Sequence, residues 1–382
     1  MQFKILTKTM QDMVNKVTKG AGNNKLLPLT SMIDINLENE VLSFTTTDMN
    51  NYLTVKETGI KGDNFNVVIP IDTFSKLVQK TTTDTITIEL NDTNIKFTGN
   101  GTYNLPIAVD EEGLGVKFPQ YSFPAEFDTD TIKLSDIRKV IENNSSCLST
   151  DMSTPCLTGY YFDNNTISTD SIAICINRSK IFNKAVLLSP IVISLLGLFD
   201  KEDITVQTAL NKIKFITPNI ILCATIMEDV EDYPAEAIEG YLDAEFSNSC
   251  KINKSTLIGV LDRMLIFIDE NRDNFSGTLI FSDKGLLIRN KDNTASELIP
   301  YVANSLTGVT GPYECNINIS ILKSQISSCS EENVNIYFGH DICIKLESEN
   351  IVKIIALTED DTEEDYEDNI EEENESSEEV EE

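Results

Sequence analysis

Residues 66–99 read NVVIPIDTFSKLVQKTTTDTITIELNDTNIKFTG, and their pattern decides the fold of this chain. The opening residues form a β-branched apolar run, and residues 71–80 place apolar side chains at helical spacing. The remainder alternates β-branched with polar residues on both sides of Asn91 and Asp92, which is typical of a β-hairpin. The stretch therefore predicts a strand, a helix and a hairpin, in that order.

The same order occurs twice more along the chain. Residues 184–217 read KAVLLSPIVISLLGLFDKEDITVQTALNKIKFIT, and residues 314–348 read ECNINISILKSQISSCSEENVNIYFGHDICIKLES. Each stretch is preceded by another predicted strand and helix. The six predicted helices span residues 8–19, 71–80, 135–146, 189–199, 254–269 and 319–329. A threefold internal repeat follows, although an ordinary multidomain α+β chain with hairpins that look alike by chance remains the alternative.

Short phrases also recur in register. The TTTD phrase at 45–48 matches STD at 168–170, and Phe118-Pro119 matches Tyr233-Pro234. The sequence therefore predicts an α+β fold of three repeated domains, each with antiparallel sheet on one side and helices on the other. The predicted domains span residues 1–125, 126–243 and 244–358, followed by a tail at 359–382.

Charge is distributed unevenly along the chain. Lys and Arg number 30 against 62 Asp and Glu, for a formal net charge of −32, which excludes a generally basic nucleic-acid packing protein. Residues 359–382 contain 16 acidic and no basic residues, so we expect them to be disordered, and the remaining body carries −16. The tail is predicted either to screen binding surfaces from unwanted partners or simply to solubilise the protein.

The predicted helices are more basic than the rest of the body. On a helical wheel of residues 8–19, Met10, Met13, Val14 and Val17 form one apolar stripe, and the lysines lie opposite. Basic residues outnumber acidic ones over the six helices together, which favours a helix-bearing surface that faces phosphate. These basic residues are Lys8, Lys16, Lys19, Lys76, Lys80, Arg138, Lys139, Lys254, Arg263 and Lys323. The alternative is that lysines simply favour helix surfaces.

Nothing in the sequence predicts catalysis, a metal site or a cofactor. His340 is the only histidine and lies at a predicted hairpin turn, and no phosphate-binding glycine loop occurs. The eight cysteines form no CxxC pair and fall mainly in apolar runs, so we expect free buried thiols in a reducing cytoplasm. The longest apolar stretch, residues 185–199, is too short for a membrane span and predicts a buried helix.

The chain resembles the bacterial-type DNA polymerase sliding clamp, the DNA polymerase III beta subunit. The phrases that carry the resemblance are LPLTSMIDINLENEVLSFTTTDMNNYL, VVIPIDTFSKLVQ, CLTGYYFDNNTISTD and Tyr233-Pro234. The resemblance covers nearly all of residues 1–358. It implies three clamp domains per chain and a head-to-tail homodimeric ring of six domains, with helices inside, facing duplex DNA, and antiparallel sheets outside. Whether the source is a bacterium or a phage stays open, with the Asn- and Ile-rich composition leaning towards a phage.

The resemblance also implies a hydrophobic pocket for partner peptides. Its matching residues are Leu157, Thr169, Ile172, Pro234, Val352, Ile354 and Ile355, for each of which core packing is the alternative role. Two features depart from the family pattern. The Gly-His-Arg loop of the family is shortened here to Ser171, and the final Met-Pro-Met-Arg-Leu phrase is replaced by residues 354–357. Partner peptides are therefore expected to differ from the usual ones.

Further positions follow from the same resemblance. Lys25 matches an arginine that touches DNA, and Tyr103 and Leu105 match residues of the ring interface, opposite Ile266, Phe267 and Ile268 of the other chain. The implied partners are double-stranded DNA bound without sequence preference, a DNA polymerase and a separate clamp loader ATPase, with no membrane. The implied function is a non-enzymatic processivity factor in the cytoplasm, or the host cytoplasm if viral. An acidic protein that binds basic partners or mimics DNA is the competing interpretation.

Overall fold

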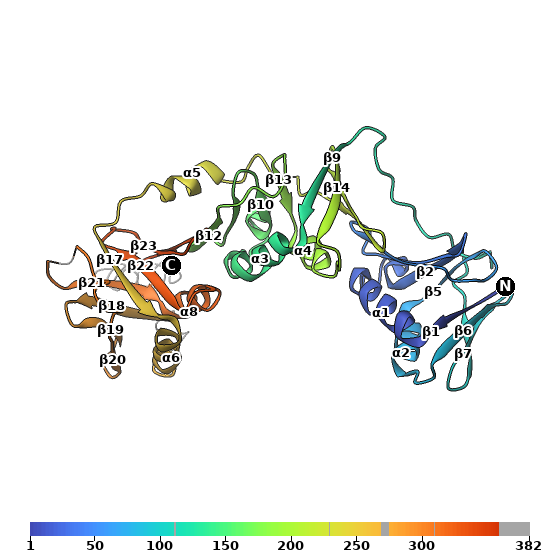
Figure 1. The fold of residues 1–382 in the computed structure, drawn as a ribbon, viewed down its shortest axis with the longest axis horizontal. Coiled ribbons are helices and arrows are strands. Elements are labelled where there is room, and N and C mark those ends of the chain that lie inside the picture. Colours follow the sequence, from blue (N-terminus) through green and yellow to red (C-terminus); the bar gives the residue numbers. More distant parts are fainter. Residues whose placement is uncertain (111, 229, 269–274, 309, 359–382) are drawn as a thin grey trace, which may run out of the picture. The chain divides into compact units, whose positions relative to one another are not determined.

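The computed structural model describes residues 1–358 apart from 111, 229, 269–274 and 309. The predicted tail at 359–382 lies outside the described residues. The order of elements along the chain occurs three times: one strand, a helix, four strands, a second helix and three closing strands (Figure 1). This recurrence confirms the threefold pattern read from the sequence.

The first repeat comprises β1 (Gln2–Leu6), α1 (Thr7–Val17), β2 (Met32–Glu38), β3 (Val41–Thr47), β4 (Tyr52–Thr58), β5 (Phe65–Pro70), α2 (Ile71–Lys80), β6 (Thr85–Leu90), β7 (Asn94–Thr98) and β8 (Thr102–Pro106). The second comprises β9 (Asp128–Lys133), α3 (Leu134–Asn144), β10 (Tyr160–Phe162), β11 (Thr166–Thr169), β12 (Ala173–Asn177), β13 (Val186–Leu188), α4 (Pro190–Leu196), β14 (Asp203–Ala209), β15 (Lys212–Ile216) and β16 (Ile220–Thr225).

After a short helix α5 (Ala235–Glu239), the third repeat comprises β17 (Asn248–Asn253), α6 (Lys254–Met264), β18 (Ser276–Ser282), β19 (Gly285–Asn290), β20 (Ser296–Ile299), β21 (Tyr313–Asn318), α8 (Ile319–Ser327), β22 (Asn333–Phe338), β23 (Cys343–Glu347) and β24 (Ile351–Ala356). Short 3₁₀ turns are η1 (Thr18–Gly20), η2 (Pro28–Ser31), η3 (Ser145–Cys147), η4 (Pro155–Thr158) and η5 (Gly240–Leu242).

The predicted helices differ from the observed ones mainly at their C-terminal ends. α2 begins and ends at the predicted residues, whereas α4 is shorter than the predicted 189–199 because its chain leaves the helix around Gly197. α6 ends at Met264, five residues before the predicted end at Asp269, which lies outside the described residues. The last residues of predicted helices 8–19 and 135–146 tighten into the 3₁₀ turns η1 and η3.

The chain forms two compact units by its internal contacts. Among the described residues, unit 1 lies within 1–142, 151–166 and 180–233, and unit 2 lies within 143–150, 167–179 and 234–358. The second repeat contributes to both units. The three predicted domain boundaries are not tested by this division and remain predictions.

Unit 1 is organised by two antiparallel sheets. The larger has the strand order β5-β2-β3-β4-β16-β15-β14-β9, and the smaller has the order β1-β6-β7-β8. β4 of the first repeat pairs with β16 of the second, with Val55 opposite Ile220 and Tyr52 opposite Cys223. This pairing makes the strands of two repeats one continuous sheet.

Unit 2 also joins strands of two repeats in one sheet. Its strands run in the order β11-β12-β24-β23-β22-β17, and a separate four-stranded sheet has the order β20-β19-β18-β21. β12 of the second repeat pairs antiparallel with β24 of the third, with Ala173 opposite Ile355 and Asn177 opposite Ile351. The two pairings between repeats, β4–β16 and β12–β24, are therefore equivalent. In each, the third of the four middle strands of one repeat pairs with the last closing strand of the next repeat.

Helix α1 buries the face that the sequence predicts. Met10, Met13, Val14 and Val17 are all buried, and the intervening residues point outward. α1 lies beside α2 (Figure 1), and the Gln11 amide donates to the carbonyl oxygens of Val78 at 3.1 Å and Thr81 at 3.0 Å. The pair of helices therefore presents its polar side chains on the surface away from the core.

Unit 2 contains a buried lysine that the sequence does not reveal. Lys353 of β24 is 1% exposed, although long charged side chains are rarely buried completely. Its ammonium donates to the Asn143 carbonyl oxygen at 3.0 Å, to Gln325 Oε1 at 3.1 Å and to the Ser328 hydroxyl. These bonds tie the last strand to the end of α3 and to α8.

Replacing this lysine tests how much that network stabilises the fold. Lys353→Ala removes three hydrogen bonds and the buried aliphatic stem, so it should lower the free energy of unfolding by roughly 2–4 kcal/mol. Urea unfolding followed by circular dichroism measures the loss. Exposed Lys4 is the matched control, because Lys4→Ala should change stability by no more than about 0.5 kcal/mol. An unchanged midpoint for Lys353→Ala would show that the network is energetically neutral.

Candidate nucleic-acid interface and partner-binding loop

The basic helix residues of unit 1 lie mostly on the surface. Lys8, Lys19, Lys76, Lys80, Arg138 and Lys139 are exposed, as is Lys25 in the loop after α1. Lys16 is less accessible, because its ammonium lies 2.9 Å from Asp12 and 3.8 Å from Asp200. Lys76 pairs with Asp72 at 2.7 Å and Lys139 with Asp136 at 3.6 Å, both within one helical turn. Within the described residues, no ion pair is recorded for Lys8, Lys19, Lys25, Lys80 or Arg138.

The basic helix residues of unit 2 are used differently. Arg263 makes a two-pronged contact with Glu297 of β20, at 2.9 Å from Nε and 2.6 Å from Nη2, which holds the pKa of that carboxyl below its usual value. Lys323 of α8 pairs with Asp262 of α6 at 2.5 Å. The Lys254 ammonium donates to carbonyl oxygens at the end of α8, including that of Ser327 at 2.9 Å. The cations of unit 2 therefore stabilise helix packing, and those of unit 1 remain more available to phosphate.

The TTTD and STD phrases fold into the same tight turn. In each, the threonine hydroxyl donates to a carbonyl oxygen four residues on, from Thr47 to Asn51 at 2.8 Å and from Thr169 to Ala173 at 2.9 Å. The following aspartate caps the turn through its carboxylate, at 2.6 Å from the Asn51 amide and 2.7 Å from the Ala173 amide. Side-chain hydrogen bonds of this kind explain why the phrase recurs in register.

One residue after each aspartate adopts a left-handed conformation. Met49 has φ +82° and Ser171 has φ +75°, where non-glycine residues are uncommon. The turn at Ser171 pushes the next side chain, Ile172, outward, and this isoleucine is 48% exposed. The Ile172 carbonyl oxygen accepts a 2.9 Å hydrogen bond from the Ala356 amide at the end of β24. An apolar side chain is thus presented on a loop that is held firmly in place.

The other predicted pocket residues are less exposed. Val352, Ile354 and Ile355 are buried in β24, and Thr169 is buried because its hydroxyl shapes the turn. Pro234 is exposed at the start of α5. Leu157 is buried in η4 and belongs to unit 1. The structure brings Thr169, Ile172 and the β24 residues together within unit 2, and the role of Leu157 in a shared pocket remains a prediction.

Some of the predicted ring-interface residues are exposed, and others are buried in the core. Tyr103 of β8 is exposed, and Leu105 is buried. Ile266 and Phe267, which follow α6, are exposed, and Ile268 is buried. β8 and β20 are the outermost strands of their four-stranded sheets, and β20 also exposes Leu298. Sequence reasoning missed β20, because nothing in its four residues indicates which strand lies at an edge.

None of the helices in the described residues combines the length and apolar character needed to cross a membrane. Among the same residues, no three His, Cys, Asp or Glu side chains gather closely enough to hold a metal ion.

The geometry defines a protein built of three repeated clamp-type domains, and comparisons with known proteins narrow this class. Residues 1–114 match the family model described as DNA polymerase III beta subunit, N-terminal domain. A search of curated protein sequences found no match.

Three solved structures illustrate the likeness in fold. The DNA polymerase sliding clamp from Bacillus subtilis is 16% identical, with a TM-score of 0.81 over 94% of this chain and 99% of that one. The beta subunit from the DNA polymerase of Streptococcus pyogenes is 17% identical, with a TM-score of 0.83 over 94% and 100%. The DNA polymerase III subunit beta from Borrelia burgdorferi is 18% identical, with a TM-score of 0.79 over 94% and 99%. The chain therefore has the fold of the bacterial DNA polymerase III beta sliding clamps, as its resemblance implies.

Thiol chemistry offers a test of the structure beside Leu157. All eight cysteines are free, and burial raises the pKa of Cys250 and Cys315 to about 12 and that of Cys223 and Cys343 to about 11. A raised thiol pKa keeps the unreactive protonated form dominant at pH 8. Cys156 of η4 and Cys329 are only partly buried, but burial raises the pKa of the Cys329 thiol, so Cys156 should react first with a disulfide reagent at pH 8. Cys156→Ser should abolish the fast phase, and a fast phase that survives would contradict the low reactivity expected of the other thiols.

Proposed function

We propose that this protein is a DNA sliding clamp, a ring that encircles duplex DNA and tethers a DNA polymerase to it. The observation that carries the proposal is the strand pairing between repeats. The third of the four middle strands in one repeat pairs with the last closing strand of the next, as β4–β16 and again as β12–β24. By the same rule β20 of the third repeat requires a closing strand, and β8 of the first repeat is the equivalent strand without such a partner.

A second copy of the chain supplies the missing pairing. β20 of one copy would pair antiparallel with β8 of the other, and the reciprocal contact would close a head-to-tail dimer of six repeats. Exposed strand edges are otherwise open to uncontrolled association, so a specific partner for both edges is physically reasonable. The exposed apolar side chains of Tyr103, Phe267 and Leu298 on or near these edges support the interface.

The exposed cations of unit 1 suit the inner surface of such a ring. Lys8, Lys19 and Lys80 on α1, η1 and α2 are exposed and lack a recorded ion pair with any described residue. Lysine contacts to phosphate are screened by salt and independent of sequence, so they allow sliding. A closed ring needs no tight grip, because its topology prevents escape from the duplex.

The loop at residues 170–172 is the proposed binding site for a polymerase. The exposed Ile172, supported by the buried β24, would accept a short apolar peptide from a polymerase. Tethering raises the concentration of the polymerase at the primer end without any new catalytic group. Ring opening would depend on a separate clamp loader ATPase.

The mass of the protein in solution tests the ring. Light scattering behind a sizing column should give twice the 42.6 kDa chain mass. A charge on the edge strand, as in Leu298→Asp, should shift the protein to monomer because it introduces an unpaired carboxylate into an apolar contact. Exposed Leu114 lies on neither edge, so Leu114→Asp should leave the dimer intact. A wild-type monomer at micromolar concentration would favour the alternative, an acidic protein that binds basic partners.

Charge reversal on the helices tests DNA engagement. The triple variant Lys8→Glu, Lys19→Glu and Lys80→Glu should weaken binding to a primed duplex by roughly tenfold or more at low salt. It should also make the negative slope of log K against log salt concentration less steep, by about 0.9 for each lost phosphate contact. A matched variant reverses Lys61, Lys117 and Lys180, which are exposed outside the helices, and should change binding much less. Equal losses in both variants would mean that only net charge matters.

A further inference from the structure

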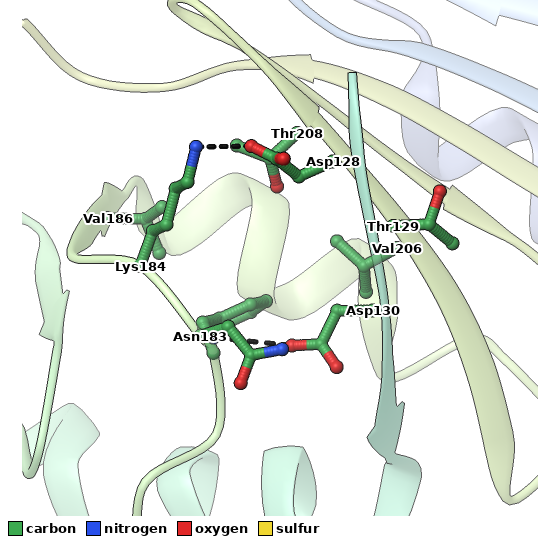
Figure 2. A pocket seen from close by; sticks show the side chains of 9 residues that line it. Asp128, Thr129, Asp130, Asn183, Lys184, Val186, Val206 and Thr208 are labelled. Carbon is green, nitrogen blue, oxygen red and sulfur yellow. Dashed lines mark hydrogen bonds and ion pairs between the residues drawn. The ribbon is translucent and has the colours of Figure 1, made fainter.

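A groove runs over unit 1, and none of the site residues predicted from the sequence lines it. It is lined by residues 124, 126–128, 184–186, 208–210, 226, 228 and 230–232, and has a volume of about 1010 Å³. A smaller hollow of about 280 Å³ adjoins it and shares Asp128, Lys184, Val186 and Thr208 (Figure 2). We call the two together the linker groove, because residues 124–128 connect the first repeat to the second.

The linker groove exposes an apolar side chain that the fold does not require. Leu210, at the turn between β14 and β15, is 90% exposed and has φ +51°. Glycine and asparagine accept this left-handed conformation readily, whereas leucine is strained in it. Phe127 on another wall is 45% exposed. A strained and exposed leucine beside an exposed phenylalanine indicates a contact with another molecule.

The wall that carries Phe127 is fixed in place before any ligand arrives. The Tyr121 hydroxyl donates to the Ala224 carbonyl oxygen at 2.8 Å, and the Lys212 ammonium donates to the Ser122 carbonyl oxygen at 2.5 Å. Ring contacts continue along the segment, from Tyr121 to Phe123 and from Phe123 to Phe127 at 5.9 Å between centroids. A preorganised wall lowers the entropic cost of binding a peptide.

The rim of the linker groove is acidic. Asp128 is paired with Lys184, as Figure 2 shows, and the Asp130 carboxylate accepts from the Asn183 amide at 3.2 Å. Four further carboxylates have no ion pair recorded with any described residue. They belong to Glu126, Glu228, Glu231 and Asp232. Such a rim repels both DNA phosphate and the acidic segment 359–382, and attracts a cation.

We propose that the linker groove binds a basic peptide segment of a partner protein, with a leucine or phenylalanine side chain against Leu210 and Phe127 and flanking lysines or arginines at the acidic rim. The apolar contact supplies affinity, and the carboxylates supply orientation and a fast, salt-dependent association rate. This surface belongs to unit 1, whereas the Ile172 loop belongs to unit 2.

A labelled peptide tests the proposal on the full-length chain. The probe is a fluorescein-labelled peptide with a central pair of leucines flanked by lysines, and fluorescence anisotropy reports its binding. Leu210→Gly should weaken binding by at least about tenfold, as expected for an anchor residue, without lowering the melting temperature, because glycine relieves the backbone strain. Reversing Glu228 and Glu231 to lysine should weaken binding similarly and flatten its salt dependence.

The controls separate the groove from general attraction to an acidic protein. Leu114→Gly, and reversal of Asp92 and Glu112 to lysine, make matched changes outside the groove and should leave binding unchanged. Ile172→Asp should also leave it unchanged, which keeps this test independent of the proposed polymerase site. Equal binding by groove and control variants, no binding by the wild-type chain, or a lower melting temperature for Leu210→Gly would each overturn the proposal.

Discussion

Backbone hydrogen bonding at the edges of antiparallel sheets is the constraint on which the rest of this structure depends. A strand at an edge carries donors and acceptors that need partners, and this chain twice pairs such strands across repeats. The β4–β16 pairing joins residues that are about 165 positions apart, such as Val55 and Ile220. Because the repeats share sheets, their cores are coupled. In the proposed ring, the edge strands β8 and β20 are the ones that would pair with a second copy.

The burial of β24 in unit 2 follows from the same need of strands for hydrogen-bonding partners. β24 lies between β12 and β23, so four of its central residues are buried and neither face is free for a charged side chain. Lys353 is nevertheless accommodated, because carbonyl and side-chain oxygens from α3 and α8 surround its ammonium. A polar network of this kind is stable only when its members are satisfied, so it also specifies how the helices meet the last strand.

Basic and acidic side chains gather in different parts of this protein. Three basic helix residues of unit 2 are bound to carboxylates or helix ends, whereas several of unit 1 stay exposed. Acidic residues gather instead around the linker groove and in segment 359–382. In the proposed clamp, the exposed cations of unit 1 face DNA, and in the proposed linker-groove interaction the acidic surface selects for basic partners.

Local periodicity was enough to predict the order of the elements, the hairpins and the limits of α2, because helices and hairpins depend on residues close in sequence. The buried stripe of α1 followed from the spacing of Met10, Met13, Val14 and Val17 for the same reason. The sequence could not reveal that Lys353 is buried, that Leu210 is strained, or that β20 and β8 are edges. The strain at Leu210 is local to the short turn between β14 and β15, where Ala209 pairs with Lys212. The burial of Lys353 and the edge positions of β20 and β8 depend instead on contacts between residues far apart along the chain, which only the tertiary structure decides, because one strand's composition does not identify its neighbour.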